Sequence, residues 1–468
     1  MTVDAREPGV EDRSSIFGPE FRATSIGLVI LESAIAFEAM AVSTALPTAA
    51  RAGHGLSAFG WAFTGFLVAN VVGMVASGQL SDRRGPRLPL IAGLLCFLLG
   101  LALAGTATTM VQLVAGRVVQ GVGSGLIITA IYVVIGDAYP ERLRPALIAA
   151  TSSAWVVPSL IGPAISGLLT EHASWRWVFL GLFPFGVIGG RLLVPVLRSL
   201  SAPESPPLRR RRVPWAVAVA LGIAALEQAG QHPSLRAAVL AAVGMAVLVV
   251  GLRSLLPRGT FRVRPGVSAP IALSGLFAGT FFGVESLIPL SLSVQHGFSA
   301  TAAGLPLAVS GFSWSAGSWW QGRLDEDAHP QRRIRLIRTG FVLSAAAAVG
   351  VAVASLPSMP GWLAYPAWGL AGLGAGFTMS SVRVVLLKYT ADADRGADSA
   401  AVQLSDATAS ALTTGLAGVL VAAAGRGVIG NTGAFVTLDL TLCGVALVGA
   451  AVSGRAGPPR VSATCAPG

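Results

Sequence analysis

The sequence predicts an all-α integral membrane protein with two six-helix pseudo-symmetric bundles and two extra central transmembrane helices, 14 spans in total. Only 12% of its 468 residues are charged, whereas a soluble domain has roughly 25%. The hydrophobic class reaches 53% and 57 glycines add to it, which is more apolar surface than a soluble fold of this size could bury. Apolar stretches of roughly 20 residues, the length of a membrane-spanning helix, recur along the whole chain.

Charged, proline-rich or glycine-rich breaks divide the chain into fourteen apolar segments. In chain order we expect spans at 23–49, 59–81, 88–106, 111–139, 146–170, 177–198, 214–230, 236–256, 268–294, 301–321, 333–355, 362–388, 398–424 and 432–453. The seventh is the weakest, because it is short and contains Glu227, and merging it with the eighth would give an odd number of spans.

These spans define the domain organisation. The parts are a cytoplasmic tail (1–22), an N-terminal six-helix bundle (23–198), an arginine-rich cytoplasmic linker (199–213), two additional helices (214–256), a cytoplasmic loop (257–267), a C-terminal six-helix bundle (268–453) and a cytoplasmic tail (454–468). The first span is expected to stay as an anchor and not to be cleaved as a signal peptide, because a charged tail precedes it and it is long.

The basic residues test this topology. Most of the 33 lysines and arginines fall in every second loop when the N-terminus is placed inside, as the positive-inside rule requires. This predicts a multi-pass protein of the inner or plasma membrane with both termini cytoplasmic. The net charge of +11 is then an orientation signal and does not indicate a nucleic-acid partner. The run Arg209 to Arg212 is expected to contact anionic lipid.

Several function classes lack their signatures. The single lysine, Lys388, stands in no phosphate-binding loop, so no nucleotide is expected. Cys96, Cys443 and Cys465 have no spacing for a disulfide framework or a metal site. No HExxH or GxSxG pattern suggests an enzyme. We therefore expect no enzyme, no metal and no cofactor; a membrane-embedded enzyme or a non-transporting receptor stays a remote alternative.

The two bundles are related by an internal repeat. A shift of about 251 residues superposes the segment that begins at Gly121 on the one that begins at Gly372, and a shift of about 244 superposes the loop at Gly78 on the one at Gly322. Parallel repeats of six spans around a central cavity are a standard plan of secondary transporters.

Four short patterns lie at fixed places on this topology. They are Glu38 with Ala45-Leu46-Pro47, the loop Gly78, Leu80, Asp82, Arg83 and Gly85, then Arg117 with Gln120-Gly121, and finally Gly162-Pro163 with Gly167, followed by Trp175-Arg176-Trp177. In this order the sequence resembles the major facilitator superfamily, specifically its fourteen-span drug:proton antiporter branch. Two departures occur: Pro86 stands where the family has a basic residue, and the fifth-span element, which begins at Pro158, matches only in part.

The acids inside the spans are the candidate site. Glu38 lies near mid-depth of the first span, and a shift of 247 residues brings it onto Glu285, so the two are expected to face each other across the cavity. Asp406 is a third candidate, and Arg117 is a fixed charge that could tune a neighbouring acid. A buried charge is costly, and burial disfavours the charged form, which suits proton coupling. The alternative is a structural carboxyl that only packs the bundle, either permanently protonated or paired with an arginine such as Arg117 or Arg383.

Three other intramembrane acids are not assigned to the site. Glu32 lies six residues before Glu38, about 240° around the helix, so the two cannot share one face. Glu227 and Asp439 stand in outlying or terminal spans and are expected to face water or lipid headgroups.

Two further elements concern conformational change. The predicted cytoplasmic gate consists of Gly78, Asp82, Arg83, Gly85, Arg87, Asp137 and Arg144. Its glycines let helix ends approach, Asp82 can cap a helix N-terminus or meet Arg142 or Arg144 of the next cytoplasmic loop, and Asp137 offers a second acid to Arg83 or Arg87. The alternative is a set of solvated, topology-determining charges. The predicted antiporter helix element consists of Pro158, Gly162, Pro163 and Gly167, which form a hinge or a seal.

The sequence and the resemblance together imply a secondary active transporter driven by the proton gradient. We expect an antiporter of the multidrug-efflux type that exports amphipathic or cationic small molecules by alternating access. Its partners would be the substrate, protons and the lipid bilayer, and the oligomeric state would be a monomer. The alternative keeps the fold and changes the cargo to a lipid, a siderophore or a self-made antibiotic.

Overall fold

Helices make up the regular structure of the computed structural model, which describes residues 15–52, 58–140, 142–200, 212–231, 234–325, 330–390 and 395–457 and shows no strand in them. The N-terminal half contains α1 (Arg22–Ala52), α2 (Phe59–Arg84), α3 (Arg87–Gly105), α4 (Met110–Ala138), α5 (Arg144–Ser153), α6 (Val156–His172), α7 (Trp177–Leu180) and α8 (Phe183–Ser199). The C-terminal half contains α11 (Ser268–His296), α12 (Ala300–Asp325), α13 (Pro330–Ala354), α14 (Ala364–Tyr389), α15 (Arg395–Gly425) and α16 (Asn431–Val452).

Two helices, α9 (Val213–Gln231) and α10 (Leu235–Leu255), lie between the halves in the sequence. Short 3₁₀ turns occur at Thr260–Arg262, Gly361–Leu363 and Ser453–Ala456. Most of the first tail, nearly all of the arginine-rich linker with Arg209 to Arg211, and most of the last tail with Cys465 lie outside the described residues.

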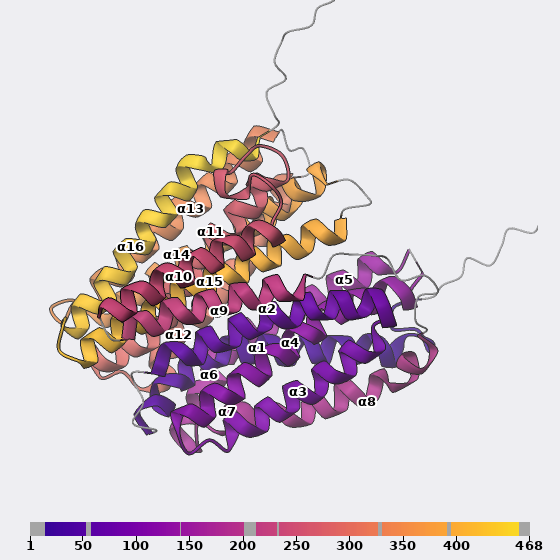
Figure 1. Cartoon of the computed structure of the whole chain (residues 1–468), viewed down its shortest axis with the longest axis horizontal. Helices are drawn as coiled ribbons and strands as arrows, with labels where there is room; N and C mark the ends of the chain where they lie inside the picture. Colours follow the sequence, from indigo (N-terminus) through magenta and orange to yellow (C-terminus); the bar gives the residue numbers. More distant parts are fainter. Residues whose placement is uncertain are drawn as a thin grey trace, which may run out of the picture.

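The two halves pack in the same way (Figure 1). In the first half α4 packs on α2 and α3, and α1 packs on α6 and α8; in the second, α14 packs on α12 and α13, and α11 on α15 and α16. The halves meet along two further pairs, α6 with α12 and α2 with α15. Helix α9 packs on α10, α2 and α15, and so touches both halves. The repeat predicted from the sequence is therefore a repeat of helix contacts.

Glycines at equivalent positions explain one pair of these contacts. A Cβ atom added at Gly121 of α4 would collide with the Phe66 carbonyl oxygen of α2, and one added at Gly372 of α14 would collide with the Ser310 carbonyl oxygen of α12. The 251-residue shift thus relates two places where backbones approach too closely for any side chain.

Twelve of the described helical segments are long and apolar enough to cross a membrane, so the structure supports twelve spans and does not confirm fourteen. The expected fifth span is divided into α5 and α6 by a turn at Ala154 and Trp155. Pro158, in the first turn of α6, lacks the N–H that would bond to the Ala154 carbonyl group, so the helix restarts there. Helix α12 has 26 residues but is not among the twelve.

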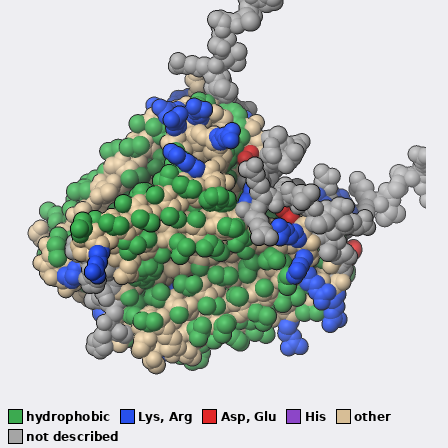
Figure 2. Space-filling model, viewed as in Figure 1, with side chains coloured by type: hydrophobic (Ala, Val, Ile, Leu, Met, Phe, Trp, Pro, Cys, Tyr) green, Lys and Arg blue, Asp and Glu red, His purple; other side chains and the backbone are tan. Residues whose placement is uncertain are grey.

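The surface fits an apolar solvent. Figure 2 shows hydrophobic side chains over the middle of the visible face, whereas lysines and arginines gather toward its margins. Exposed side chains such as Leu95 (63%), Val111 (79%) and Leu235 (84%) belong to helices of the twelve candidate spans. Large apolar patches on a soluble protein would be a liability, and on a membrane protein they contact lipid.

Candidate proton and substrate site

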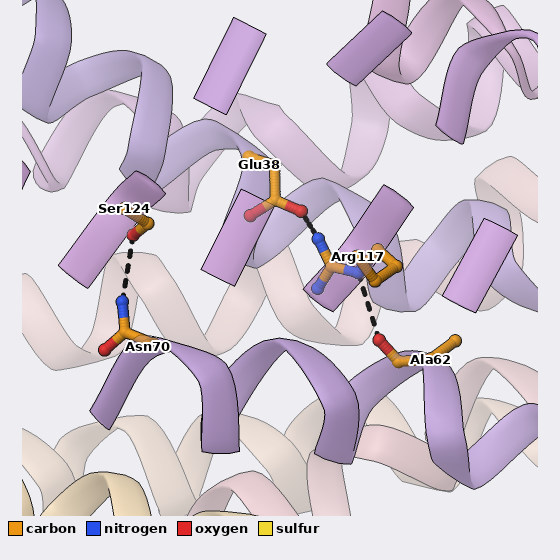
Figure 3. Close-up of polar contacts among 5 residues, drawn as sticks. All are labelled: Glu38, Ala62, Asn70, Arg117 and Ser124. Carbon is orange, nitrogen blue, oxygen red and sulfur yellow. Dashed lines mark hydrogen bonds and ion pairs between the residues drawn. The ribbon is translucent and has the colours of Figure 1, made fainter. Parts of the chain in front are cut away.

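The most buried charges of the N-terminal half form one ion pair. Glu38 of α1 pairs with Arg117 of α4, and the carboxylate and the guanidinium side chains are 0% and 3% exposed (Figure 3). Of the two structural readings left open for Glu38, pairing with Arg117 is the one that the structure shows. Two charges taken out of water stabilise a fold only when their geometry and remaining hydrogen bonds are good, so the surroundings decide what the pair can do.

Helix α2 holds the guanidinium independently of Glu38. Arg117 Nε donates a hydrogen bond to the Ala62 carbonyl oxygen at 3.0 Å, and its Cζ atom lies 4.2 Å from the centroid of the Phe66 ring, a favourable cation–π distance. Nearby, Asn70 donates to Ser124 at 3.0 Å and also links α2 to α4 (Figure 3). The cation therefore has two partners besides Glu38.

The second carboxylate oxygen of Glu38 is available to a ligand. Glu38 Oε2 is buried and makes no hydrogen bond to a described residue. Buried polar atoms are nearly always hydrogen-bonded, so an orphaned carboxylate oxygen at the centre of a bundle indicates a place where a proton, a water molecule or a substrate donor binds.

The equivalent pair in the C-terminal half has a different composition. The shift of 247 residues relates Glu38 to Glu285 of α11, and the shift of 251 relates Arg117 to Trp368 of α14. Glu285 is 6% exposed and lies against the Trp368 indole. The same two helices thus place an acid beside a permanent cation in one half and beside an uncharged indole in the other.

Aromatic rings surround the Trp368 side of this second site. The Phe281 ring lies 4.8 Å from Trp368 and 5.3 Å from Trp314, centroid to centroid. Phe277 stacks on Phe281 at 6.3 Å. Carboxylate and aromatic faces together are the chemistry that recognises an organic cation. Trp314 is one of 10 tryptophans along the chain, and the sequence alone does not show which of them meet Phe281.

Asp406 and Glu32 are two further intramembrane acids, and they lie outside the Glu38–Arg117 and Glu285–Trp368 pairs. Asp406 of α15 is partly buried and lies within interaction range of the Ser274 hydroxyl group of α11 and of Arg383. The 251-residue shift relates Asp406 to Trp155, whose Nε1 donates to Glu32 Oε1 at 2.8 Å. Glu32 and Glu38 do face different neighbours. Glu32 is nevertheless only 3% exposed, although the sequence did not assign it to the candidate site.

The expectation that Glu227 and Asp439 face water or headgroups is wrong, because each is only 2% exposed. Both stand on helices that looked peripheral in sequence order. Their burial follows from which side of the helix packs on the bundle, which an almost uniformly apolar sequence does not reveal.

Comparison with known proteins identifies the fold family. The model of the Major Facilitator Superfamily matches residues 28–414. The chain belongs to this superfamily. Multidrug resistance protein 3 of Bacillus subtilis is 29% identical over 265 residues, 53% of this chain and 51% of that protein. MFS-type transporter gkaD of Penicillium citrinum is 31% identical over 290 residues, 59% of this chain and 49% of that one.

The chain spans about half the length of these curated relatives. Among solved structures, an auto-inhibited POT family peptide transporter superposes with a TM-score of 0.69 at 14% identity, over 95% of this chain and 99% of that one; this similarity concerns the fold. Membership in this superfamily and the twelve candidate spans together give the chain a multi-pass membrane fold.

The two glycines of the predicted cytoplasmic gate differ in their surroundings. Gly85 ends α2 with φ 73°, a left-handed value that favours glycine, whereas a Cβ atom at Gly78 would meet nothing. No described helix thus approaches Gly78 in this structure, and a close approach there stays a prediction.

The charged residues of the gate have other neighbours than expected. Asp137 lies in the field of Arg144, whose Nε donates to the Tyr139 carbonyl oxygen at 2.9 Å. The Arg83 side chain is exposed, Asp82 is partly buried, and Arg87 lines a surface cavity between α1, α3 and α8. A pairing of Arg83 or Arg87 with Asp137 stays a prediction.

The predicted antiporter helix element packs closely against the C-terminal half. A Cβ atom at Gly167 would lie 2.5 Å from Thr301 Cα of α12, and one at Gly304 of α12 would lie 3.2 Å from the Pro163 carbonyl oxygen. At Gly162 the nearest atom, Met40 Cβ, would be 3.6 Å away, an ordinary contact. Gly167 is thus the close-approach position, and Pro163 stays inside a continuous helix.

A carboxylate caps this contact on the side predicted to face outward. Glu171 accepts a hydrogen bond from the Thr301 backbone N–H at 2.5 Å, at the first turn of α12. This hydrogen bond lowers the pKa of the exposed Glu171 carboxyl below its ordinary value. The charged form therefore stabilises the closed contact of α6 with α12, and this contribution is lost as the pH falls through the lowered pKa.

Replacing Glu171 with alanine should loosen this contact. Glu171→Ala removes the acceptor for an N-terminal backbone N–H of α12, and loss of such a cap costs about 1 kcal/mol. The expected result is a several-fold increase in alkylation of a cysteine introduced at Thr301 by a membrane-impermeant maleimide. Glu20→Gln, an exposed carboxyl outside the helices, is the control. Equal labelling in all three proteins would contradict this role.

Proposed function

We propose that this protein is a proton-coupled antiporter that exports amphipathic or cationic small molecules by alternating access. The observation that supports this most strongly is the pair of equivalent buried acids with unlike partners: Glu38 beside Arg117, and Glu285 beside Trp368. Each intramembrane acid is expensive to bury, and the chain belongs to a superfamily of transporters.

The two acids are expected to have different roles, because their partners differ in charge. Beside a guanidinium that always keeps its proton, Glu38 is stable as a carboxylate. Glu285 is buried beside the uncharged Trp368 indole, so it is stable as the neutral acid until water or a cation arrives. A cationic substrate that displaces the Glu285 proton and is released when the proton returns would exchange with protons at one site.

Alternating access requires the closed contacts of the two halves to open in turn. Helices α6 and α12 pack on each other between the halves, so we infer that both cross the bilayer with the twelve apolar helices, which restores a fourteen-span topology. On this topology the protein lies in the inner or plasma membrane, and both of its termini are cytoplasmic. The protein would act as a monomer without a cofactor.

The deciding experiment is proton flux from purified protein in liposomes. With a pH-sensitive dye inside, addition of a lipophilic cation such as ethidium should release protons from acid-loaded vesicles, and Glu285→Gln should abolish that release. Vesicles with protein reconstituted in an inactive, heat-treated form are the control. Ethidium transport without proton movement would exclude antiport, and no transport of any compound in a panel of dyes and lipids would favour a receptor.

One observation favours the alternative cargo. A surface cavity of about 450 Å³ opens between α1, α3 and α8. Its apolar wall includes Leu90 and Leu94, and it carries Arg87, Arg191 and Arg198, an arrangement that suits a lipid-like anion as well as a bilayer lipid. If export of a fluorescent lipid persists when both Glu38 and Glu285 are replaced with glutamine, the dedicated lipid exporter is the better function.

A further inference from the structure

The extra helix α9 places a carboxyl group where the two halves of the transporter meet. Gly60 of α2 and Gly418 of α15 belong to opposite halves, and a Cβ atom added at Gly60 would lie 2.5 Å from Gly418 Cα. The same added atom would lie 2.7 Å from Glu227 Oε1. Helices α2, α15 and α9 therefore converge on one point. Helices α2 and α15 touch there through glycine backbone atoms, and α9 adds the Glu227 carboxyl group to this contact.

Neither oxygen of Glu227 has a hydrogen-bond partner among the described residues, and the residue is 2% exposed. The Thr64 hydroxyl group of α2 is the polar group beside it. A Cβ atom at Gly415 of α15 would lie 3.4 Å from Thr64 Oγ1 and 3.8 Å from Glu227 Oε2. The carboxyl group is thus enclosed by two glycines of α15, one of α2 and a single hydroxyl group.

No counter-charge from the helices packed against α9 reaches this point. Asp82 and the arginines after it lie 22 or more residues along α2 from Gly60, about 33 Å away. On α15, Asp406 lies 12 residues before Gly418, about 18 Å away, and the exposed Arg426 just after the helix lies 8 residues beyond Gly418, about 12 Å away. Helix α10 carries Arg236 and Arg253 only in its end turns, and the Arg236 side chain is exposed. An unpaired carboxylate here would be far more costly than the neutral acid.

We propose that Glu227 is a proton-binding site that controls the opening of the α2–α15 contact. The acid is protonated while Gly60 and Gly418 touch, and it gives up its proton when the contact parts and water reaches the carboxyl group. The extra helices thereby sense pH at the seam between the halves. The proposal rests on the alternating access of the proposed function and adds a proton site distinct from Glu38 and Glu285.

The direction of the effect follows from linkage. A ligand shifts an equilibrium only by its differential affinity for the two states, and here the proton binds the closed contact more tightly. Low pH on that side therefore favours closure and high pH favours opening, by up to about tenfold in the open-to-closed ratio for each pH unit over the titration range. Gly60 and Gly418 lie near the ends of α2 and α15 that are predicted to face outward, so the relevant pH is that outside the cell.

Spin-label distances measure this opening without measuring transport. Arg51 at the end of α1 and Arg426 just after α15 are exposed residues of opposite halves. In the full-length protein with its cysteines replaced by serine, labels at R51C and R426C should show a longer-distance population that grows between pH 5 and pH 9. With Glu227→Gln this growth should disappear and the short distance should predominate at every pH. Gln228→Ala, on the exposed side of the same helix, should keep the parental response.

Two further variants keep the test decisive. Glu227→Leu fills the site without a titratable group and should reproduce the pH-independent closed population if the glutamine variant folds poorly. Glu227→Asp keeps the titration and should keep a pH response. An undiminished response in Glu227→Gln or Glu227→Leu overturns the proposal. If instead proton flux on substrate addition is absent while Glu227 still governs the distances, the antiport mechanism fails and the pH-sensing seam stands.

Discussion

Arg117→Met should destabilise the protein by about 3–5 kcal/mol, because removing one partner of a buried ion pair leaves the other charge uncompensated. Glu38 is 0% exposed, and its second oxygen has no hydrogen-bond partner among the described residues, so none of these residues stands ready to replace the guanidinium. The expected observations are a lower melting temperature in detergent and loss of proton flux. Arg117→Lys, which keeps the charge but loses the fork that reaches both Glu38 and the Ala62 carbonyl group, should fall between the two proteins.

The double variant Glu38→Leu, Arg117→Met separates structure from function. Replacing both members of a buried pair with apolar groups of similar volume is often neutral or stabilising, so the melting temperature should return to the parental value or exceed it. Proton flux should stay absent, because the buried charge pair of Glu38 and Arg117 is gone. If the double variant recovers both stability and proton-coupled transport, the pair only packs the bundle; if Arg117→Met alone is harmless, the two charges do not depend on each other.

The architecture followed from the sequence wherever a pattern repeats. The 251-residue shift relates Gly121 to Gly372, and the structure shows that both bring the fourth helix of a half onto the second. The continuous fifth span was wrong because hydropathy averages over a window and does not register the missing N–H of Pro158. Helix α12 shows the reverse limit: it was placed within a few residues, although it is too polar to count as a span by hydropathy alone.

The site was predictable residue by residue but not in its contacts. Glu38 and Arg117 each stood out as charges inside apolar segments, whereas their pairing depends on the rotation of α1 against α4. Trp368 was missed, although the shift that superposes the two halves carries Arg117 onto it. Glu227 was misjudged because order along the chain says little about burial: α9 follows a complete bundle in sequence and yet packs on α2 and α15.

Glu285→Gln should leave the protein stable and remove its dependence on the proton gradient. Glutamine is close in shape to the protonated acid that the apolar surroundings of Glu285 favour, so the melting temperature should stay near the parental value. If one proton is exchanged for each substrate, a gradient of one pH unit sustains about tenfold accumulation of substrate in vesicles. The variant should reach only equal concentrations on both sides, while exchange of labelled for unlabelled substrate continues.

The matched variant for this experiment is Trp368→Phe, which keeps the aromatic face and removes the indole N–H beside Glu285. It should weaken substrate affinity and preserve gradient-driven accumulation, because the carboxyl group that exchanges the proton is intact. Tenfold accumulation by Glu285→Gln would assign the exchange to another acid, and Asp406, in reach of Ser274 and Arg383, is the one to replace next. The unlike partners of the two equivalent acids would then be a difference in packing alone, and the division of charge between the halves would lose its mechanistic meaning.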